Sequence, residues 1–126
     1  MARALLLLRV LWEFVRYDIV NRLRGFAAIR RQAAGLPQSS GLAGAAPAEG
    51  IARAVNCMCS FYWKPLLCLQ RSVVTARVMR AYGIQAQVVI GYRAYPFLSH
   101  AWVEVGGRVV NDSPAYQTKM QVLDRF

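Results

Sequence analysis

The spacing of apolar residues changes abruptly at Gly83, and this change limits the folds open to the chain. Before it, residues 65–83 carry a wide apolar face at three- and four-residue steps, which predicts a buried helix. Pro65 suits the first turn of this helix, and Gly83 suits its C-terminal stop. After Gly83, every second residue from Ile84 to Ile90 is apolar, which predicts a β-strand with one buried face.

Two further alternating runs, 100–105 and 108–111, flank Gly106-Gly107 and predict a β-hairpin. A loop that includes Pro96 is expected between Gly91 and His100. Helices come first in this chain and hairpin-connected strands follow. We therefore expect an α+β fold in which an antiparallel sheet packs on the helix that carries Cys68.

The N-terminal residues 3–31 predict an amphipathic helix, with Gly25 as a point where it can break in two. We expect its apolar stripe to pack on the domain core; a membrane surface or a partner's groove are the alternatives. Residues 35–50, rich in Gly, Pro, Ser and Ala, predict a linker before a short helix over 51–57. The predicted organisation is a basic helical segment (1–34), the linker (35–50) and a core (51–126). The stripe consists of Leu5, Leu8, Trp12, Val15, Ile19, Leu23 and Phe26.

The charge balance is strongly basic, with a formal net charge of +10. Seven of the 16 basic residues precede Gln32, so the charge belongs largely to the N-terminal segment. Nucleic acid, an anionic membrane surface and an acidic peptide are the partners that such a charge favours. With 56% hydrophobic and 17% charged residues, the chain is too apolar to be disordered.

The cysteine count and the N-terminal run both bear on the compartment. Three cysteines, an odd number, favour a reducing environment over a disulfide framework. The apolar run near the N-terminus is interrupted by Arg9 and Glu13 and is shorter than the roughly 20 residues needed to span a bilayer. We therefore expect a cytoplasmic protein, with peripheral membrane contact through the N-terminal helix as a further option.

Three residues form a candidate hydrolytic site. Cys68 is expected in the first turn of the buried helix, where unpaired N–H groups and the helix dipole favour thiolate. The single histidine, His100, would accept and return the proton, and Asp112 or its rival Asn111 would orient the imidazole. In the regular two-residue hairpin, Asn111 shares a face with His100 and Asp112 does not. We favour Asp112, because a carboxylate stabilises an imidazolium better, and so predict an odd-length loop or a bulge before it.

A zinc site is the competing arrangement, with Cys57, Cys59, Cys68 and His100 as ligands. The Cys-x-Cys spacing of the first pair is unlike the usual spacing of zinc ligands, and no second pair stands opposite. Cys57 and Cys59 are therefore predicted to be small buried residues, and no metal is expected.

Two stretches resemble the transglutaminase-like cysteine peptidases that remove leader peptides in lasso-peptide biosynthesis, a branch of the papain-like superfamily. They are "CLQRSVVTARVMRAYGIQAQVVIGYR" and "HAWVEVGGRVVND". The match extends from about Trp63 to Asp112, and the basic N-terminal helix and chain length are similar as well. Residues 92–99 show no family residue that can be assigned to substrate reading.

The resemblance implies Cys68 as nucleophile, His100 as general base and acid, and Asp112 as the orienting carboxylate, with a thioester acyl-enzyme. The substrate would be a ribosomally made precursor peptide, cut between leader and core. A separate leader-binding protein and a cyclase related to asparagine synthetases would be its partners. It implies no nucleic acid, metal or organic cofactor. Trp63 and Gln70 are candidates for the second oxyanion donor.

A different class of function stays open on the residues alone. A non-enzymatic basic module could bind nucleic acid or an acidic partner through the arginines and through the aromatic residues Tyr62, Trp63, Tyr92 and Tyr95. Against it, the arginines lie on a helix with a strong apolar stripe, and no recognised nucleic-acid motif is present.

Overall fold

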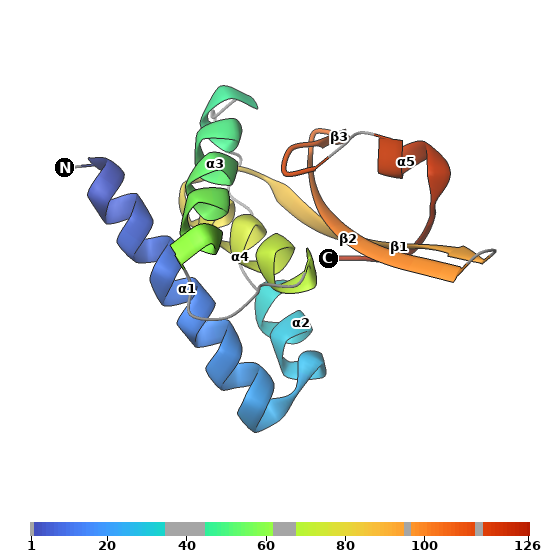
Figure 1. The fold of residues 1–126 in the computed structure, drawn as a ribbon, viewed down its shortest axis with the longest axis horizontal. Coiled ribbons are helices and arrows are strands. Elements are labelled where there is room, and N and C mark those ends of the chain that lie inside the picture. Colours follow the sequence, from blue (N-terminus) through green and yellow to red (C-terminus); the bar gives the residue numbers. More distant parts are fainter. Residues whose placement is uncertain (1, 35–44, 62–67, 95–96, 113–114) are drawn as a thin grey trace.

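Helices form one side of the molecule and a curved antiparallel sheet the other (Figure 1). The computed structural model describes residues 2–34, 45–61, 68–94, 97–112 and 115–126. The helices are α1 (Ala2–Arg24), α2 (Phe26–Ala34), α3 (Ala45–Phe61), α4 (Cys68–Ala81) and the short α5 (Ala115–Lys119). The strands are β1 (Ala86–Ala94), β2 (Phe97–Val105), β3 (Arg108–Val109) and β4 (Gln121–Arg125). The predicted α+β class with an antiparallel sheet is confirmed.

Helix α4 lies at the centre of the fold, between α1 and α3 on one side and strands β1 and β2 on the other. Its valines, together with Ala76 and Met79, form the main core with residues of α1, α3 and the sheet. The helix ends where predicted: Gly83 has a φ of 84°, and the N–H of Ile84 donates to the carbonyl of Met79 at 2.9 Å. A residue without a side chain accepts this left-handed conformation most easily, so the sequence places the stop.

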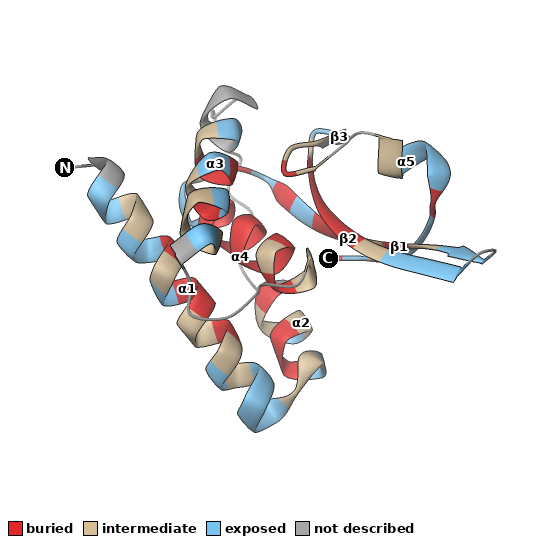
Figure 2. Cartoon of the chain, viewed as in Figure 1, coloured by how far each residue is buried: buried red, intermediate tan, exposed pale blue. Residues whose placement is uncertain are grey.

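The N-terminal segment is two helices, because the chain breaks at Gly25, whose φ is 79°. The predicted packing of its apolar stripe is wrong. The residues of α1 that face the core are Val10, Phe14 and Tyr17, and most of the predicted stripe is exposed. Figure 2 shows the buried and exposed faces alternating along this helix. The helix is apolar on two sides, and only tertiary contact with α3 and α4 decides which side is buried.

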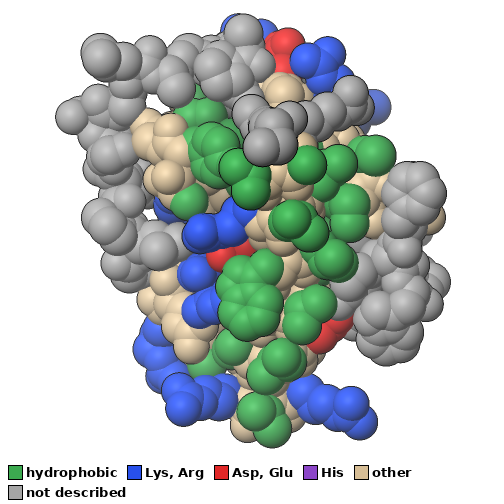
Figure 3. All heavy atoms as spheres, turned by 90° about the vertical axis from the view of Figure 1, so that its left-hand side faces the viewer, with side chains coloured by type: hydrophobic (Ala, Val, Ile, Leu, Met, Phe, Trp, Pro, Cys, Tyr) green, Lys and Arg blue, Asp and Glu red, His purple; other side chains and the backbone are tan. Residues whose placement is uncertain are grey.

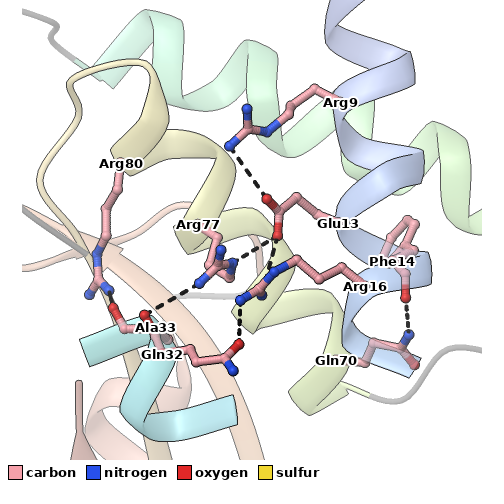
Figure 4. A network of polar contacts seen from close by, with 9 residues as sticks. All are labelled: Arg9, Glu13, Phe14, Arg16, Gln32, Ala33, Gln70, Arg77 and Arg80. Atoms are coloured by element: carbon pink, nitrogen blue, oxygen red, sulfur yellow. Dashed lines mark hydrogen bonds and ion pairs between the residues drawn. The ribbon is translucent and has the colours of Figure 1, made fainter. Parts of the chain in front are cut away.

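Polar contacts join α1 and α2 to α4 (Figure 4). The buried carboxylate of Glu13 accepts a hydrogen bond from Nε of Arg77 at 2.7 Å, and Arg9 lies 3.4 Å from its other oxygen. Arg16 donates to Gln32 on α2. A buried charge must be paired and hydrogen-bonded to be tolerated. This network therefore makes the N-terminal helices an integral layer over α4.

The helix predicted over 51–57 is longer than expected, since α3 begins at Ala45 and ends at Phe61. The last six residues of the predicted linker are thus helical, whereas 35–44 lie outside the described residues. Alanine-rich sequence favours helix, and a proline is tolerated in a first turn whose N–H groups lack partners anyway. Among the described residues, no helix combines the length and apolar character needed to cross a bilayer.

The sheet has the strand order β3-β2-β1-β4, with every neighbouring pair antiparallel. The loop predicted between Gly91 and His100 is wrong, because β1 and β2 stay paired as far as Ala94↔Phe97. Strand β4, which the alternation did not reveal, pairs with the outer edge of β1. Its residues are mostly exposed, so they carry little apolar periodicity.

Candidate active site

Cys68 lies in the first turn of α4 (Cys68–Ala81) and is a half-buried free thiol; the predicted start of this helix at Pro65 lies outside the described residues. The preceding residues 62–67 lie outside the described part of the chain. At this position the unpaired N–H groups of the first turn and the helix dipole favour a negative charge. The start of α4 can therefore stabilise a thiolate, and also the oxyanion that forms when a thiolate attacks a carbonyl.

His100 on β2 is paired with Asp112, which follows β3. Its Nε2 lies 2.7 Å from Oδ2 of Asp112, and the ring N–H donates because a carboxylate only accepts. The same oxygen accepts a hydrogen bond from Nη2 of Arg71 at 3.2 Å. Arg71 stands one turn after Cys68 on α4, so Asp112 joins the histidine to the beginning of that helix. With Nε2 engaged, Nδ1 is the ring nitrogen left with a lone pair.

Asn111 does not contact the imidazole. Its Oδ1 accepts the backbone N–H of Val103 at 2.8 Å, and its Nδ2 donates to Oγ of Ser72 at 3.2 Å. The amide side chain thus takes the place of a backbone partner for β2 and fastens this segment to α4. The structure brings Asp112, and not Asn111, to His100.

However, the predicted odd-length loop or bulge before Asp112 is wrong. The hairpin has the regular two-residue turn, with Val105 paired to Arg108, and Gly106 and Gly107 both have positive φ. No bulge interrupts the short ladder, whose last strand residue is Val109. Instead the chain bends directly after β3, and this bend presents Asp112 to the histidine. A register argument assumes a continuing strand, and here the strand stops after two residues.

An aromatic and acidic cluster surrounds the imidazole. Tyr116 of α5 stacks on His100 with ring centroids 4.1 Å apart, and Trp102 stacks less closely at 6.3 Å. The indole N–H of Trp102 donates to Glu104 at 2.9 Å, and Arg125 donates to the same carboxylate at 2.7 Å. The alternation of β2 sets the histidine, Trp102 and Glu104 on one face. No sequence signal pointed to Tyr116.

The charge of Glu104 is kept despite its burial. Burial raises the pKa of this carboxyl, but hydrogen bonds from Trp102, Arg125 and Gln117 outweigh burial and hold the pKa below its usual range. Glu104 is therefore an ionised acceptor that fixes the Trp102 ring next to His100.

Comparison with known proteins identifies the family of this chain. The family model described as the transglutaminase-like superfamily matches residues 11–125, which is nearly the whole chain. The chain belongs to the transglutaminase-like superfamily. The resemblance predicted from the sequence and the fold expected from it are confirmed.

Part of the chain is also similar to a characterised protein. Over 56 residues the chain is 46% identical to the microcin J25-processing protein McjB of Escherichia coli. The aligned stretch covers 44% of this chain and 27% of the relative, so the chain spans about a quarter of that protein's length. No solved structure matches.

The structure describes only one of the two predicted oxyanion donors. Trp63 lies outside the described residues. Gln70 is buried, and its amide nitrogen donates to Oδ1 of Asp18 at 3.1 Å and to the carbonyl of Phe14 at 3.4 Å. Both amide hydrogens are thus directed to α1, and the oxyanion role of Gln70 stays a prediction.

The surroundings of Cys68 include α1 as well. Burial, followed by the nearby negative charges of Asp18 and Cys68, raises the pKa of Tyr17 to about 12. The phenol of Tyr17 is therefore neutral at any physiological pH. Among the described residues, no hydrogen bond joins the thiol of Cys68 to the His100 ring; the link between α4 and the ring is made by Arg71 and Asp112.

The zinc arrangement does not form. In the described ranges no three of the His, Cys, Asp and Glu side chains gather closely enough to hold a metal ion. Cys57 and Cys59 lie on α3 and are half-buried. Burial, partly offset by the charge of Arg71, raises the pKa of the Cys59 thiol. Cys59 is therefore a poorer nucleophile at neutral pH than an ordinary exposed thiol.

Proposed function

We propose that this protein is a cysteine peptidase that cleaves the leader from a lasso-peptide precursor. Cys68 is the nucleophile, His100 the general base and acid, and Asp112 the residue that orients the imidazole. The observation that carries the proposal is the 2.7 Å contact between His100 and Asp112, held by Arg71 to the helix that Cys68 begins. The family and the name of the relative, which processes microcin J25, support the substrate class.

Acylation begins with proton transfer from the thiol of Cys68 to Nδ1 of His100. The thiolate attacks the carbonyl carbon of the bond between leader and core, and the first-turn N–H groups of α4 stabilise the oxyanion. The tetrahedral intermediate collapses, the C–N bond breaks, and the imidazolium gives its proton to the leaving amine. The products of this half are the free core peptide and a thioester between the leader and Cys68.

Deacylation reverses these roles with water. Nδ1 of His100 takes a proton from water as the water oxygen attacks the thioester carbonyl. The C–S bond breaks, the leader leaves as a carboxylic acid, and the thiolate recovers its proton. Asp112 stabilises the imidazolium in both halves, and Arg71 fixes the carboxylate in position. No cofactor takes part in either half.

The resemblance to lasso-peptide leader peptidases suggests two partners for this protein. A separate leader-binding protein would present the precursor, and an asparagine-synthetase-like cyclase would take the freed core. Arg71, on the helix that carries Cys68, binds Asp112, and Asp112 binds the imidazole. Hydrogen bonds between catalytic groups often tighten only when the substrate is bound, so we expect the leader to complete the site.

The test separates the nucleophile from the other two thiols. Full-length protein is mixed with a leader–core precursor peptide and its leader-binding protein, and the released core is measured by mass spectrometry. Cys68→Ala should abolish cleavage, whereas Cys57→Ala and Cys59→Ala should retain most of it. These two variants are matched controls, because each removes one half-buried thiol from α3 and leaves α4 unchanged.

A second measurement does not depend on the precursor. Iodoacetamide labelling below neutral pH, followed by peptide mapping, should modify Cys68 first, and His100→Gln should slow that labelling. Cleavage by the Cys68→Ala protein at the wild-type rate would refute the assignment. Equally slow labelling of all three thiols would instead favour the non-enzymatic basic module.

A further inference from the structure

A row of large apolar side chains lies exposed along the outer side of α1. Figure 3, which turns this side to the viewer, shows hydrophobic side chains following the helix with basic side chains beside them. Leu5, Leu8, Trp12, Ile19 and Leu23 are between 48% and 77% exposed. We call these five residues the outer stripe. A contiguous apolar surface of this kind marks a place where something else binds.

The outer stripe is a straight ridge and not a groove. Its members recur at three-, four- and seven-residue steps, so they follow one face of the helix. From Leu5 to Leu23 this face extends for roughly 27 Å, at about 1.5 Å per residue. The opposite side of α1, with Val10, Phe14 and Tyr17, is already buried against the domain. The ridge is therefore held rigidly in place by the fold.

The charges around the outer stripe are positive. Arg9 is half exposed, and Arg22 and Arg24 at the end of α1 are exposed. The helix has five basic and two acidic residues, so its net charge is positive even though Glu13 pairs with Arg9. Glu13 is buried against Arg77, and Asp18 accepts a hydrogen bond from Gln70.

We propose that the outer stripe of α1 binds the surface of an anionic lipid bilayer, with the helix lying in the plane of the interface. Leucines and a tryptophan would enter the boundary between headgroups and acyl chains, while the arginines contact anionic headgroups. A second copy of this chain is disfavoured, because it would bring a net charge of +10 against an equal charge. A flat, deformable surface also accepts a ridge better than a rigid protein face does.

The experiment is co-sedimentation of the full chain with vesicles. Vesicles of equal parts phosphatidylcholine and phosphatidylglycerol should bind the protein, and vesicles of phosphatidylcholine alone should bind it far less. Leu8→Gln combined with Leu23→Gln should lower the ratio of bound to free protein by about tenfold or more. Raising the ionic strength should weaken binding as well, because headgroup attraction is screened.

Leu123→Gln is the matched control, since Leu123 on β4 is 62% exposed, the same fraction as Leu8. It should leave vesicle binding within about twofold of the wild type. Arg22→Gln with Arg24→Gln should weaken binding, whereas Arg53→Gln at an exposed position of α3 should not. Circular dichroism establishes that each variant is folded.

Three outcomes would overturn the proposal. The first is no binding to anionic vesicles at low salt, and the second is equal loss in the control variant Leu123→Gln. The third is binding that depends on the arginines but not on Leu8 and Leu23, which would be charge attraction without insertion. A dimer that Leu8→Gln dissociates, seen by light scattering without vesicle binding, would assign the outer stripe to a second copy instead.

Discussion

Gly91 lies so close to Trp102 that adding one carbon there tests the packing around His100. A Cβ at this position would stand 2.6 Å from Cη2 and 2.8 Å from Cζ3 of the indole ring, and 3.2 Å from Cβ of Met120. Trp102 is fully buried, so its ring cannot move aside without displacing its neighbours. Overpacking of this kind costs about 1–3 kcal/mol. We expect Gly91→Ala to lower the melting temperature by about 4–12 °C for a chain of this size.

Gly91→Ala should also disturb the surroundings of His100, because Trp102 stacks beside His100 and its indole N–H donates to Glu104. We expect slower labelling of Cys68 and slower cleavage even at temperatures where the variant is fully folded. Thermal and urea unfolding give the stability, and labelling gives the effect on the site.

Gly50 provides a control in the opposite direction. It lies within α3, and a Cβ there would meet nothing within 4 Å. Gly50→Ala should therefore raise the free energy of unfolding by about 0.5–1 kcal/mol, since alanine is the better helix former. A Gly91→Ala protein as stable as the wild type, or equal shifts in both variants, would refute the packing argument.

Three further results are expected. Glu13→Ala should lower the free energy of unfolding, measured with urea, by about 3–5 kcal/mol, because it leaves the buried charge of Arg77 without its partner. Replacing both Glu13 and Arg77 by methionine should recover most of that loss. Folding lowers the pKa of Glu104, so the ionised carboxylate stabilises the fold above its unfolded pKa and this contribution is lost as the pH falls through the folded pKa. Glu104→Gln should therefore make the free energy of unfolding fall less steeply with decreasing pH on the acid side. An unchanged pH dependence would contradict this. Asp112→Asn should lower the cleavage rate by several orders of magnitude and leave precursor binding little changed, as judged by fluorescence anisotropy, because the amide no longer stabilises the imidazolium on His100.

Local rules predicted much of the fold from the sequence. The change of period at Gly83, the positive φ at Gly106 and Gly107, and the break at Gly25 all depend on residues close together in the chain. Their conformations follow from backbone sterics, which neighbouring residues determine. The place of Cys68 in the first turn of α4 was also predictable, because helical periodicity and Pro65 are local signals.

The candidate site was only partly predictable. The thiol, the single histidine and the acid could be named because each is a rare chemical group at a recognisable end of an element. The stacking of Tyr116 on His100 could not, because α5 is short and carries no periodic pattern. The contact between Arg71 and Asp112 joins residues 41 positions apart, and no local rule predicts it.

What the sequence determined by itself is the kind of each main element and the chemistry of its polar residues, since both depend on neighbours a few positions away. Tertiary structure alone decided which of the two apolar sides of α1 is buried, because both sides satisfy the same helical period and only one fits against α3 and α4. It also decided that a bend after the two-residue strand β3 brings Asp112 to His100. Hydrogen bonds between Asn111 and residues of β2 and α4 hold this bend in place. In both cases several local conformations have similar energy, and long-range packing and hydrogen bonding select one of them.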